Sequence, residues 1–500
     1  MTKPAPPSSR LPADAGAPRA CPWASSPRRS SLLTWPVLAW GLWDWGSAAF
    51  NAVITTFVFT VYLTSEAFGP EASTQSALST GLAVAGVCIA LLAPVTGQRA
   101  DRAGRTVFWL AAYTAVVVAV SAAMFLVLPR PGYLWLGIVL LGVGNVFFEL
   151  ATVNYNGMLG HLATRDRIGA VSGLGWGMGY IGGIVLLLIV YVGFIQPQVG
   201  WFGVTGEDGL DVRVSVLLSA LWFGVFALPV VVTQSGRGAR RRRARVAVAN
   251  QEEASRGQER QAATMETGPD DQQEQVPRRR ESLVASYVGL WRTLARLRHD
   301  HPEVLWFLLA SAVFRDGLAG VFTYGGVIAQ ATFGFSAGDV VVFAVAANLV
   351  AGVTTIAAGR LDDAVGARRV ILGSLAVLVV AGVLVFVLHD AGAGVFWALG
   401  LVLSGCVGPA QSASRSFLAR LIPPGREGEV FGLYATTGRA VSFLAPMMYG
   451  AFLGVGASVE GASATHWGVL GVVAVVLAGL LLMLRVRDTD GQVALGGAGA

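Results

Sequence analysis

The sequence predicts an all-α integral membrane protein with twelve transmembrane helices, arranged as two six-helix halves related by a parallel pseudo-twofold repeat. Three observations support this prediction. The 500 residues are 54% hydrophobic and only 13% charged, whereas soluble globular chains carry about 25% charged residues. Apolar runs of about 20 residues, the length that crosses a bilayer as a helix, recur along the chain. Two motifs of the first half also return in the second half.

Twelve apolar runs are long enough to be transmembrane spans, six before a long polar stretch and six after it. We expect spans at 34–63, 75–96, 107–129, 133–157, 168–196 and 212–234, and then at 302–330, 338–358, 369–388, 393–419, 429–455 and 465–485. The 63 glycines fit these spans because small residues let membrane helices approach closely. The chain therefore divides into an N-terminal half, 34–234, and a C-terminal half, 302–487.

The remaining segments are polar. Residues 1–33 are rich in Pro, Ala, Ser and Arg and lack the apolar core of a signal peptide, so we expect a disordered tail. Residues 488–500 are expected to form a second tail. The stretch 235–301 is expected to be a linker. Near 283–299, Tyr287 and three leucines recur at helical spacing between arginines, which predicts an amphipathic helix on the inner leaflet.

The arginines predict the orientation of the chain. Alternate loops carry arginine clusters, whereas the opposite loops hold only Arg130 and Arg213 beside several acids. The clusters are Arg99, Arg102 and Arg105; Arg165 and Arg167; Arg360, Arg368 and Arg369; Arg420 and Arg426. Because cytoplasmic loops carry an excess of Lys and Arg, we expect both termini and the linker in the cytoplasm of a protein of the cell membrane.

Two motifs reveal the internal repeat. Gly97-x-x-x-Asp101-x-x-Gly104 returns, 262 residues later, as Gly359-x-x-x-Asp363-x-x-Gly366. Arg167-x-Gly169-x-Val171-x-Gly173-Leu174 returns, 259 residues later, as Arg426-x-Gly428-x-Val430-x-Gly432-Leu433. Two matches in the same order at nearly one offset indicate a parallel repeat of six-helix halves. In transporters built this way the solute site lies at the interface between the repeats, near the bilayer midplane.

The loop from Gly97 to Arg105, Gly-Gln-Arg-Ala-Asp-Arg-Ala-Gly-Arg, resembles the signature loop of the major facilitator superfamily, Gly-x-x-x-Asp-Arg/Lys-x-Gly-Arg-Arg/Lys, and departs from it only at Thr106. The resemblance implies the major facilitator fold. It also implies that Asp101, supported by Arg102 and Arg105, latches the two halves together on the cytoplasmic side, with Gly97 and Gly104 allowing close approach and a tight turn. Asp363 and Arg368 are expected to form a weaker second latch.

Other residues point to one branch of that superfamily. Trp43-Asp44-Trp45, Tyr155-Asn156, the stretch from Ser172 to Gly177 and Gly432-Leu433-Tyr434 resemble the vacuole-effluxer-like family, which includes autophagy-related amino-acid effluxers. Ser47 departs from the asparagine expected there. The resemblance implies solute transport and makes amino acids candidate substrates without fixing the substrate.

Five ionisable residues fall well inside the expected spans, where each charge costs roughly 2.5–3.5 kcal/mol or more without a partner or water. They are Asp44, Glu149, Arg315, Asp316 and Arg439. Three acids against two arginines leave one acid unpaired. A proton-coupled carrier would use such an acid, because burial disfavours its charged form.

These residues have alternative roles. We expect Asp44, near mid-depth, to bind a cationic group or the coupling proton, or else to form an ion pair that only holds helices together. Arg315 and Arg439 either bind a substrate carboxylate, which suits the arginine fork, or neutralise Asp44 and Glu149. Glu149 is expected in a structural pair. Polar residues such as Asn51 and Tyr155 are further candidates for the solute path.

The predicted function is secondary active transport of a small polar solute. No phosphate-binding loop Gly-x-x-x-x-Gly-Lys-Ser/Thr occurs in the sequence, so transport is expected to run on ion gradients, with a proton as the coupling ion. No catalytic set, metal site or cofactor motif is evident, which argues against an enzyme. We expect a monomer that does not bind nucleic acid. The alternatives are a multidrug-type exporter and a non-transporting membrane sensor or scaffold.

Overall fold

The computed structural model describes residues 33–235, 299, 302–422, 425–461 and 464–487. The expected tails and the expected amphipathic helix near 283–299 lie almost wholly outside the described residues.

Within the described ranges, twelve helices are long and apolar enough to cross a membrane. This confirms the predicted twelve spans. They are Trp35–Leu63, Glu71–Ala103, Thr106–Leu126, Pro131–Leu162, Ile168–Ile195, Glu207–Ser235, Pro302–Ala331, Gly338–Val365, Ala367–Val387, Ala393–Leu421, Glu427–Glu460 and Trp467–Leu484.

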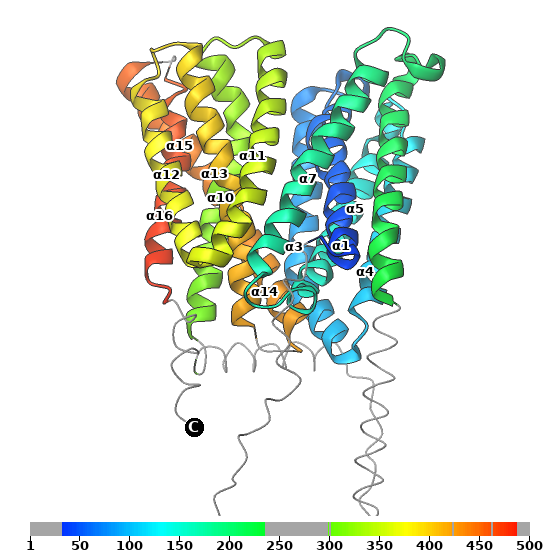
Figure 1. Ribbon diagram of the computed structural model, residues 1–500. Coiled ribbons are helices and arrows are strands. Elements are labelled where there is room, and N and C mark those ends of the chain that lie inside the picture. The colour runs from blue at the N-terminus through cyan, green and yellow to red at the C-terminus, as the bar shows by residue number, and fades with distance from the viewer. Residues whose placement is uncertain (1–32, 236–298, 300–301, 423–424, 462–463, 488–500) are drawn as a thin grey trace, which may run out of the picture.

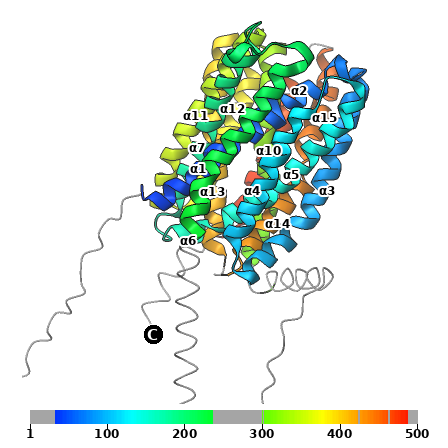
Figure 2. The ribbon, with the colours of Figure 1, turned by 90° about the vertical axis from the view of Figure 1, so that its right-hand side faces the viewer.

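The spans form two bundles that stand side by side (Figure 1). The N-terminal bundle contains α1 (Trp35–Ala49), α3 (Glu71–Ala103), α4 (Thr106–Ala123), α5 (Leu134–Gly157), α7 (Ile168–Val190) and the span Glu207–Ser235. The C-terminal bundle contains α10 (Pro302–Ala331), α11 (Ala337–Val365), α12 (Ala367–Val387), α13 (Ala393–Leu421), α14 (Glu427–Ala440), α15 (Leu444–Glu460) and α16 (Trp467–Leu484). Seen from the side, the bundles overlap in one block (Figure 2).

Two helix crossings join the bundles, α3 with α14 and α7 with α11. At the first, a Cβ on Gly97 would collide with the carbonyl of Gly428, and a Cβ on Gly432 would come within 2.5 Å of the Cα of Pro94. At the second, a Cβ on Gly173 would lie 2.8 Å from the Cα of Gly359. Small residues therefore let backbone meet backbone at both crossings. The crossings are equivalent under the repeat, as a parallel pseudo-twofold arrangement requires.

Both crossings lie toward the same end of the molecule, which we call the arginine-rich end because it carries the arginines of the segments 97–106, 163–167 and 359–369. Figure 1 shows α14 at this end, between the two bundles. At the opposite end the bundles have their own short loops, such as Ser65–Pro70 and Leu388–Gly392.

Two spans that were expected to be continuous are interrupted near their middle. Span 1 passes through a π-helical stretch, Phe50–Phe57. Span 11 ends as α14 at Ala440 and restarts as α15 at Leu444. The physical cause of the second break is Pro446, because proline has no N–H for the carbonyl four residues earlier and its ring collides with that carbonyl.

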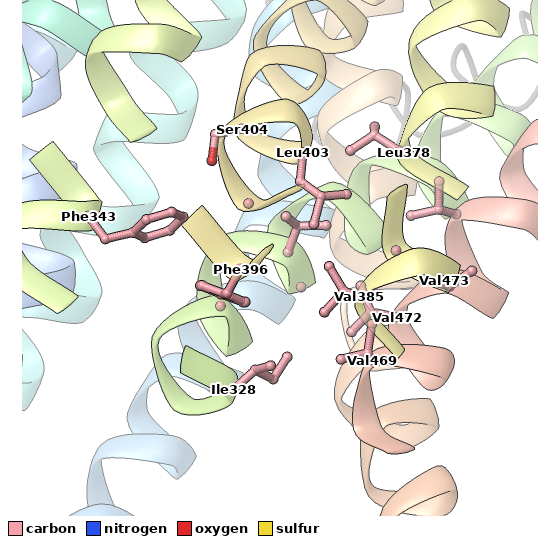
Figure 3. A pocket seen from close by; sticks show the side chains of 16 residues that line it. Ile328, Phe343, Leu378, Val385, Phe396, Leu403, Ser404, Val469, Val472 and Val473 are labelled. Atoms are coloured by element: carbon pink, nitrogen blue, oxygen red, sulfur yellow. The ribbon is translucent and has the colours of Figure 1, made fainter. Parts of the chain in front are cut away.

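The C-terminal bundle contains a partly open pocket of about 60 Å³. Phe343 and Phe396 line one side of it, and Val472 and Val473 line the other (Figure 3). The lining is apolar apart from Ser404 and backbone atoms. A polar solute would lose its hydrogen bonds there, so the solute site has to be sought elsewhere.

Candidate functional site

The first cluster of buried polar residues joins the two halves through Asp44. Asp44 lies on α1, about 14 Å along the helix from its first residue at 1.5 Å per residue. The Tyr155 hydroxyl donates a hydrogen bond to Asp44 Oδ2 at 2.8 Å. Arg415, on α13 of the other half, places Nη1 3.2 Å from the same oxygen. Asp44 and Tyr155, both singled out from the sequence, therefore meet, together with an arginine that the sequence analysis omitted.

Arg415 is 1% exposed, although it carries a charge. Its guanidinium donates to Ser172 Oγ at 3.0 Å, to the Ser172 carbonyl at 2.6 Å and to Asn156 Oδ1 at 3.3 Å. These acceptors lie on α7 and α5 of the N-terminal half. Arg415 thus reaches from one half into the other, and four oxygen contacts, including the one to Asp44, offset the cost of burying its charge.

Aromatic rings surround the same guanidinium. Its carbon lies 4.8 Å from the ring centroid of Trp40, 5.0 Å from that of Trp176 and 5.7 Å from that of Tyr155. All three distances fall within the roughly 6 Å over which a ring attracts a cation. We call Asp44, Trp40, Tyr155, Asn156, Ser172 and Trp176 the cation cage.

A second ion pair between the halves lies farther from the arginine-rich end than the pair of Asp44 and Arg415. Arg439 Nη2 is 3.3 Å from Glu149 Oε2. Arg439 is twelve residues into α14, or about 18 Å along it. The side chain of Arg439 is 39% exposed and that of Glu149 is 16% exposed, against 2% and 14% for Arg415 and Asp44. Arg439, farther from the arginine-rich end, is therefore more exposed than Arg415.

Arg315 and Asp316, neighbours on α10, contact the two sides of the break in span 11. Arg315 Nη1 donates to the Tyr434 carbonyl of α14 at 3.2 Å, and its guanidinium stacks on the Tyr434 ring at 3.9 Å. The backbone N–H of Ala445, in the first turn of α15, donates to Asp316 Oδ2 at 2.6 Å. A cation toward the end of one helix and a carboxylate at the start of the next both complement the helix dipoles.

The balance of membrane charges differs from the sequence-based count. Adding Arg415 gives three acids and three arginines, so the inferred excess of one acid was wrong. Arg415 lies inside the expected span 393–419 but was left out of that count. Among the described residues, Asp316 is the membrane acid of this set for which no arginine lies within ion-pair distance.

At the arginine-rich end, Asp101 bonds to the first turn of α14. The backbone N–H groups of Gly428 and Glu429 donate to its two carboxylate oxygens at 3.0 and 2.9 Å. Beside it, Gln98 Nε2 donates to the buried carboxylate of Glu429 at 2.8 Å. Gly104 ends α3 in the left-handed conformation at φ 58°, which glycine adopts without strain.

Asp363 makes the equivalent contact in the other direction. The N–H groups of Gly169 and Ala170, in the first turn of α7, donate to it at 2.7 and 2.8 Å. Arg420 pairs with Asp363 at 3.0 Å and with the neighbouring Asp362 at 2.5 Å.

One expected member of this region, Arg368, differs from the expectation, and three further candidate residues are exposed. Arg368, expected beside Asp363, lies elsewhere, because its guanidinium donates to the carbonyls of Val486 and Leu484 at the end of α16. Arg102 and Arg105 are exposed. Asn51, expected on the solute path, lies in the exposed part of the π-helical stretch, where the Thr55 hydroxyl donates to its carbonyl.

The sequence offered two signals for Arg415. It falls in a polar stretch, Gln411 to Ser416, inside an otherwise apolar span. It also lies 259 residues after Asn156, which is the repeat offset, and the two side chains touch.

These contacts form three tiers between the halves. At the arginine-rich end, Asp101 and Asp363 each cap the first turn of a helix in the opposite half; we call these two contacts the caps. The pair of Asp44 and Arg415 lies next, and the more exposed pair of Glu149 and Arg439 lies farthest from that end. The side chains of Glu149 and Arg439 are together more exposed than those of Asp44 and Arg415.

Residues 64–493 match the protein family described as "Vacuole effluxer Atg22 like". The chain is 22% identical over 451 residues to the MFS-type transporter YxiO of Bacillus subtilis, covering 88% of this chain and 92% of that protein. It is 25% identical over 303 residues to Autophagy-related protein 22-2 of Aspergillus clavatus, covering 56% of this chain and 42% of that protein.

Solved structures share the fold. The proton:xylose symporter XylE gives a TM-score of 0.61 at 16% identity, over 91% of this chain and 95% of that chain. The human organic anion transporter MFSD10 gives 0.62 at 14% identity, over 90% and 99%. A bacterial homologue of the iron transporter ferroportin, in an outward-facing state, gives 0.57 at 13% identity, over 90% and 98%. At these identities the likeness shows the fold alone.

Proposed function

The chain belongs to the vacuole effluxer Atg22-like family, a secondary transporter family of the major facilitator fold, and we propose that it carries a small zwitterionic solute, of the amino-acid class, between its two halves. The observation that carries this proposal is the partly exposed ion pair of Glu149 and Arg439 across the interface.

This pair offers both charges that a zwitterion needs. The Arg439 guanidinium matches a carboxylate in two-point geometry, and the Glu149 carboxylate accepts hydrogen bonds from an ammonium group. A solute that binds both groups replaces their mutual contact at 3.3 Å. The two charges therefore keep a partner whether or not the solute is present, which membrane charges require.

Arg315 supports the same site from α10. A Cβ on Gly438, one residue before Arg439, would lie 3.3 Å from Arg315 Nη1, so the two arginines approach the break in span 11 from different helices. Arg315 is therefore a second candidate for binding an anionic group of the solute. This charged surface also disfavours the multidrug-type exporter, whose cargo requires a mostly apolar site.

We further propose that the arginine-rich end faces the cytoplasm and that this conformation opens to the opposite side of the membrane. The excess of arginine at this end supports that orientation. The bacterial relative YxiO is matched over most of its length, and the fungal relative over less than half, so the cell membrane is the proposed location. Both described ends of the chain, at residues 33 and 487, would then lie toward the cytoplasm.

Asp316 is the proposed coupling-proton site. Its carboxylate is 8% exposed and accepts the N–H of Ala445. No arginine lies within ion-pair distance among the described residues. Gain and loss of a proton would alter how firmly Asp316 holds the start of α15, which links the proton to the break beside the solute site.

Purified protein in proteoliposomes, with an imposed pH gradient, tests the function directly. A panel of radiolabelled neutral, acidic and basic amino acids should include at least one that accumulates against its gradient. Protein-free liposomes and liposomes without the pH gradient are the controls. If none of the panel accumulates or exchanges while the protein is folded and inserted, the amino-acid proposal fails.

A further inference from the structure

The cation cage belongs to one half of the molecule, whereas the cation in it belongs to the other. Asp44 and Trp40 lie on α1, Tyr155 and Asn156 on α5, and Ser172 and Trp176 on α7. Arg415 enters from α13. When the halves separate at the arginine-rich end, as alternating access requires, Arg415 leaves with α13 and the cage stays behind.

Asp44, Trp40 and Tyr155 of the cage are held in place without Arg415, whereas Ser172 and Trp176 also donate hydrogen bonds to Ser412 and Gln411 of α13. The Tyr155 hydroxyl fixes Asp44 at 2.8 Å, and Trp40 Nε1 donates to the Tyr155 carbonyl at 3.1 Å. The rings of Trp40 and Tyr155 stack at 4.3 Å with an interplanar angle of 5°, and both side chains are fully buried. Trp43 stacks on the other side of Tyr155, also at 4.3 Å. These contacts lie within the N-terminal half and do not depend on the partner half.

An empty cage would contain an acid without its ion partner. Leaving one member of a buried pair alone costs several kcal/mol, so another cation has to replace the guanidinium. The acceptors define its chemistry. The Ser172 carbonyl and Asn156 Oδ1 accept hydrogen bonds, so the cation should carry N–H donors. The three aromatic rings favour a cation that is delocalised or weakly hydrated.

We infer that the cation cage is an organic-cation binding site of the N-terminal half, which Arg415 fills in this conformation and which a guanidinium or primary ammonium group fills when the halves part at the arginine-rich end. Arg415 acts as a tethered competitor for this site. The inference rests on the proposed alternation of the halves, and it adds that the solute's cationic group is received on the cytoplasmic side by Asp44.

Removing the competitor tests the site. The variant Arg415→Ala should have a lower Tm than the wild type, and methylguanidinium should raise that Tm in a saturable manner, because a ligand that binds only the folded state stabilises it. Ethylammonium should act more weakly in the same direction. Tetramethylammonium, which fits aromatic rings but has no N–H donor, should act more weakly than methylguanidinium. The double variant Arg415→Ala/Asp44→Asn should not respond to any of the three.

A matched control separates this site from any unpaired acid. Arg439→Ala also strands a carboxylate, that of Glu149, but outside the aromatic cage, and methylguanidinium should stabilise it less than it stabilises Arg415→Ala. Equal stabilisation of both variants would overturn the inference. So would an Arg415→Ala protein whose Tm rises at low pH and ignores methylguanidinium, since a proton would then be the replacement.

A second variant keeps the test open if Arg415→Ala does not fold. Asp101→Asn/Asp363→Asn weakens both caps and retains Arg415, so the arginine-rich end should open more often. Methylguanidinium should then change the tryptophan fluorescence saturably, and adding Asp44→Asn should abolish the change; no change in the parent variant would overturn the inference. These experiments measure binding, so they can succeed while uptake of every amino acid fails, and the reverse.

Discussion

Asp101 and Asp363 are 262 residues apart in the chain, and each carboxylate accepts two backbone N–H groups from the first turn of a helix in the opposite half. The pseudo-twofold repeat therefore relates the two contacts: Asp101 of the N-terminal half bonds to α14, and Asp363 of the C-terminal half bonds to α7. We expect closure of the arginine-rich end to depend on both contacts.

Asp101→Asn should shift the protein toward a state that is open at the arginine-rich end. Asparagine retains one acceptor but loses the charge that complements the start of α14, so about 1 kcal/mol of closure energy should be lost, a factor of about 5 in the conformational equilibrium. The opening can be measured as the distance between spin labels at Ala103 and Arg369, which are exposed positions of the two halves. Asp166→Asn, an exposed acid that pairs with Arg167 of its own half, is the control.

Gly97→Ala should obstruct the crossing of α3 and α14, because the new methyl group collides with the carbonyl of Gly428. We expect the same spin-label pair to report opening, together with a lower Tm. Gly86→Ala, on the same helix, adds a methyl group where nothing lies within 4 Å. If the two alanine variants behave alike, the crossing does not limit closure.

Arg439→Ala should reduce solute uptake with normal expression and insertion. Loss of one partly exposed charge–carboxylate contact is worth about 1–2 kcal/mol, or roughly 5- to 30-fold in apparent affinity. Uptake in proteoliposomes measures the effect, and Arg130→Ala, an exposed arginine of the opposite loops, should leave it unchanged. Wild-type uptake by Arg439→Ala would exclude this arginine from the solute site.

Asp316→Asn should uncouple transport from the proton. The amide still accepts the N–H of Ala445 and preserves the start of α15, but it cannot exchange a proton. Accumulation driven by a pH gradient should be lost, whereas exchange of labelled for unlabelled solute should persist. Retained pH-driven accumulation would place the coupling proton elsewhere.

Acid should destabilise the end opposite the arginine-rich end. Burial lowers the pKa of His466 below its ordinary value of 6.5, and the His389 ring, stacked on it at 3.9 Å, lowers this pKa further, against the opposing effects of Glu460 and Asp390. The folded state thus binds this proton less tightly than the unfolded chain, so the stability from His466 is fully present above pH 6.5 and decreases as the pH falls below it.

Tm measured against pH tests this assignment. His466→Gln should flatten the decrease below pH 6.5, whereas His161→Gln, at the arginine-rich end, should not. An unchanged acid profile in His466→Gln would assign the effect to other groups.

The sequence was sufficient for the spans, because bilayer crossing depends on local apolarity and length. It was also sufficient for the pseudo-twofold relation, because the repeated motifs are local. Pairings across the interface were not accessible in this way. Asp44 meets Arg415 over 371 residues, and Asp363 meets Arg420 rather than Arg368, since each partner is set by how the two bundles pack.

The break in span 11 has a mechanical consequence. α14 packs on α3 and α5 of the N-terminal half as well as on α10, whereas α15 packs on α16 and α10 of its own half. Val441 to Phe443, between them, lie outside regular helix. A tilt of α14 that releases the N-terminal half can therefore be absorbed by the backbone torsions of three residues. Span 11 would then move as two separate helices joined by a hinge. α14 would tilt while α15 keeps its position in the C-terminal half.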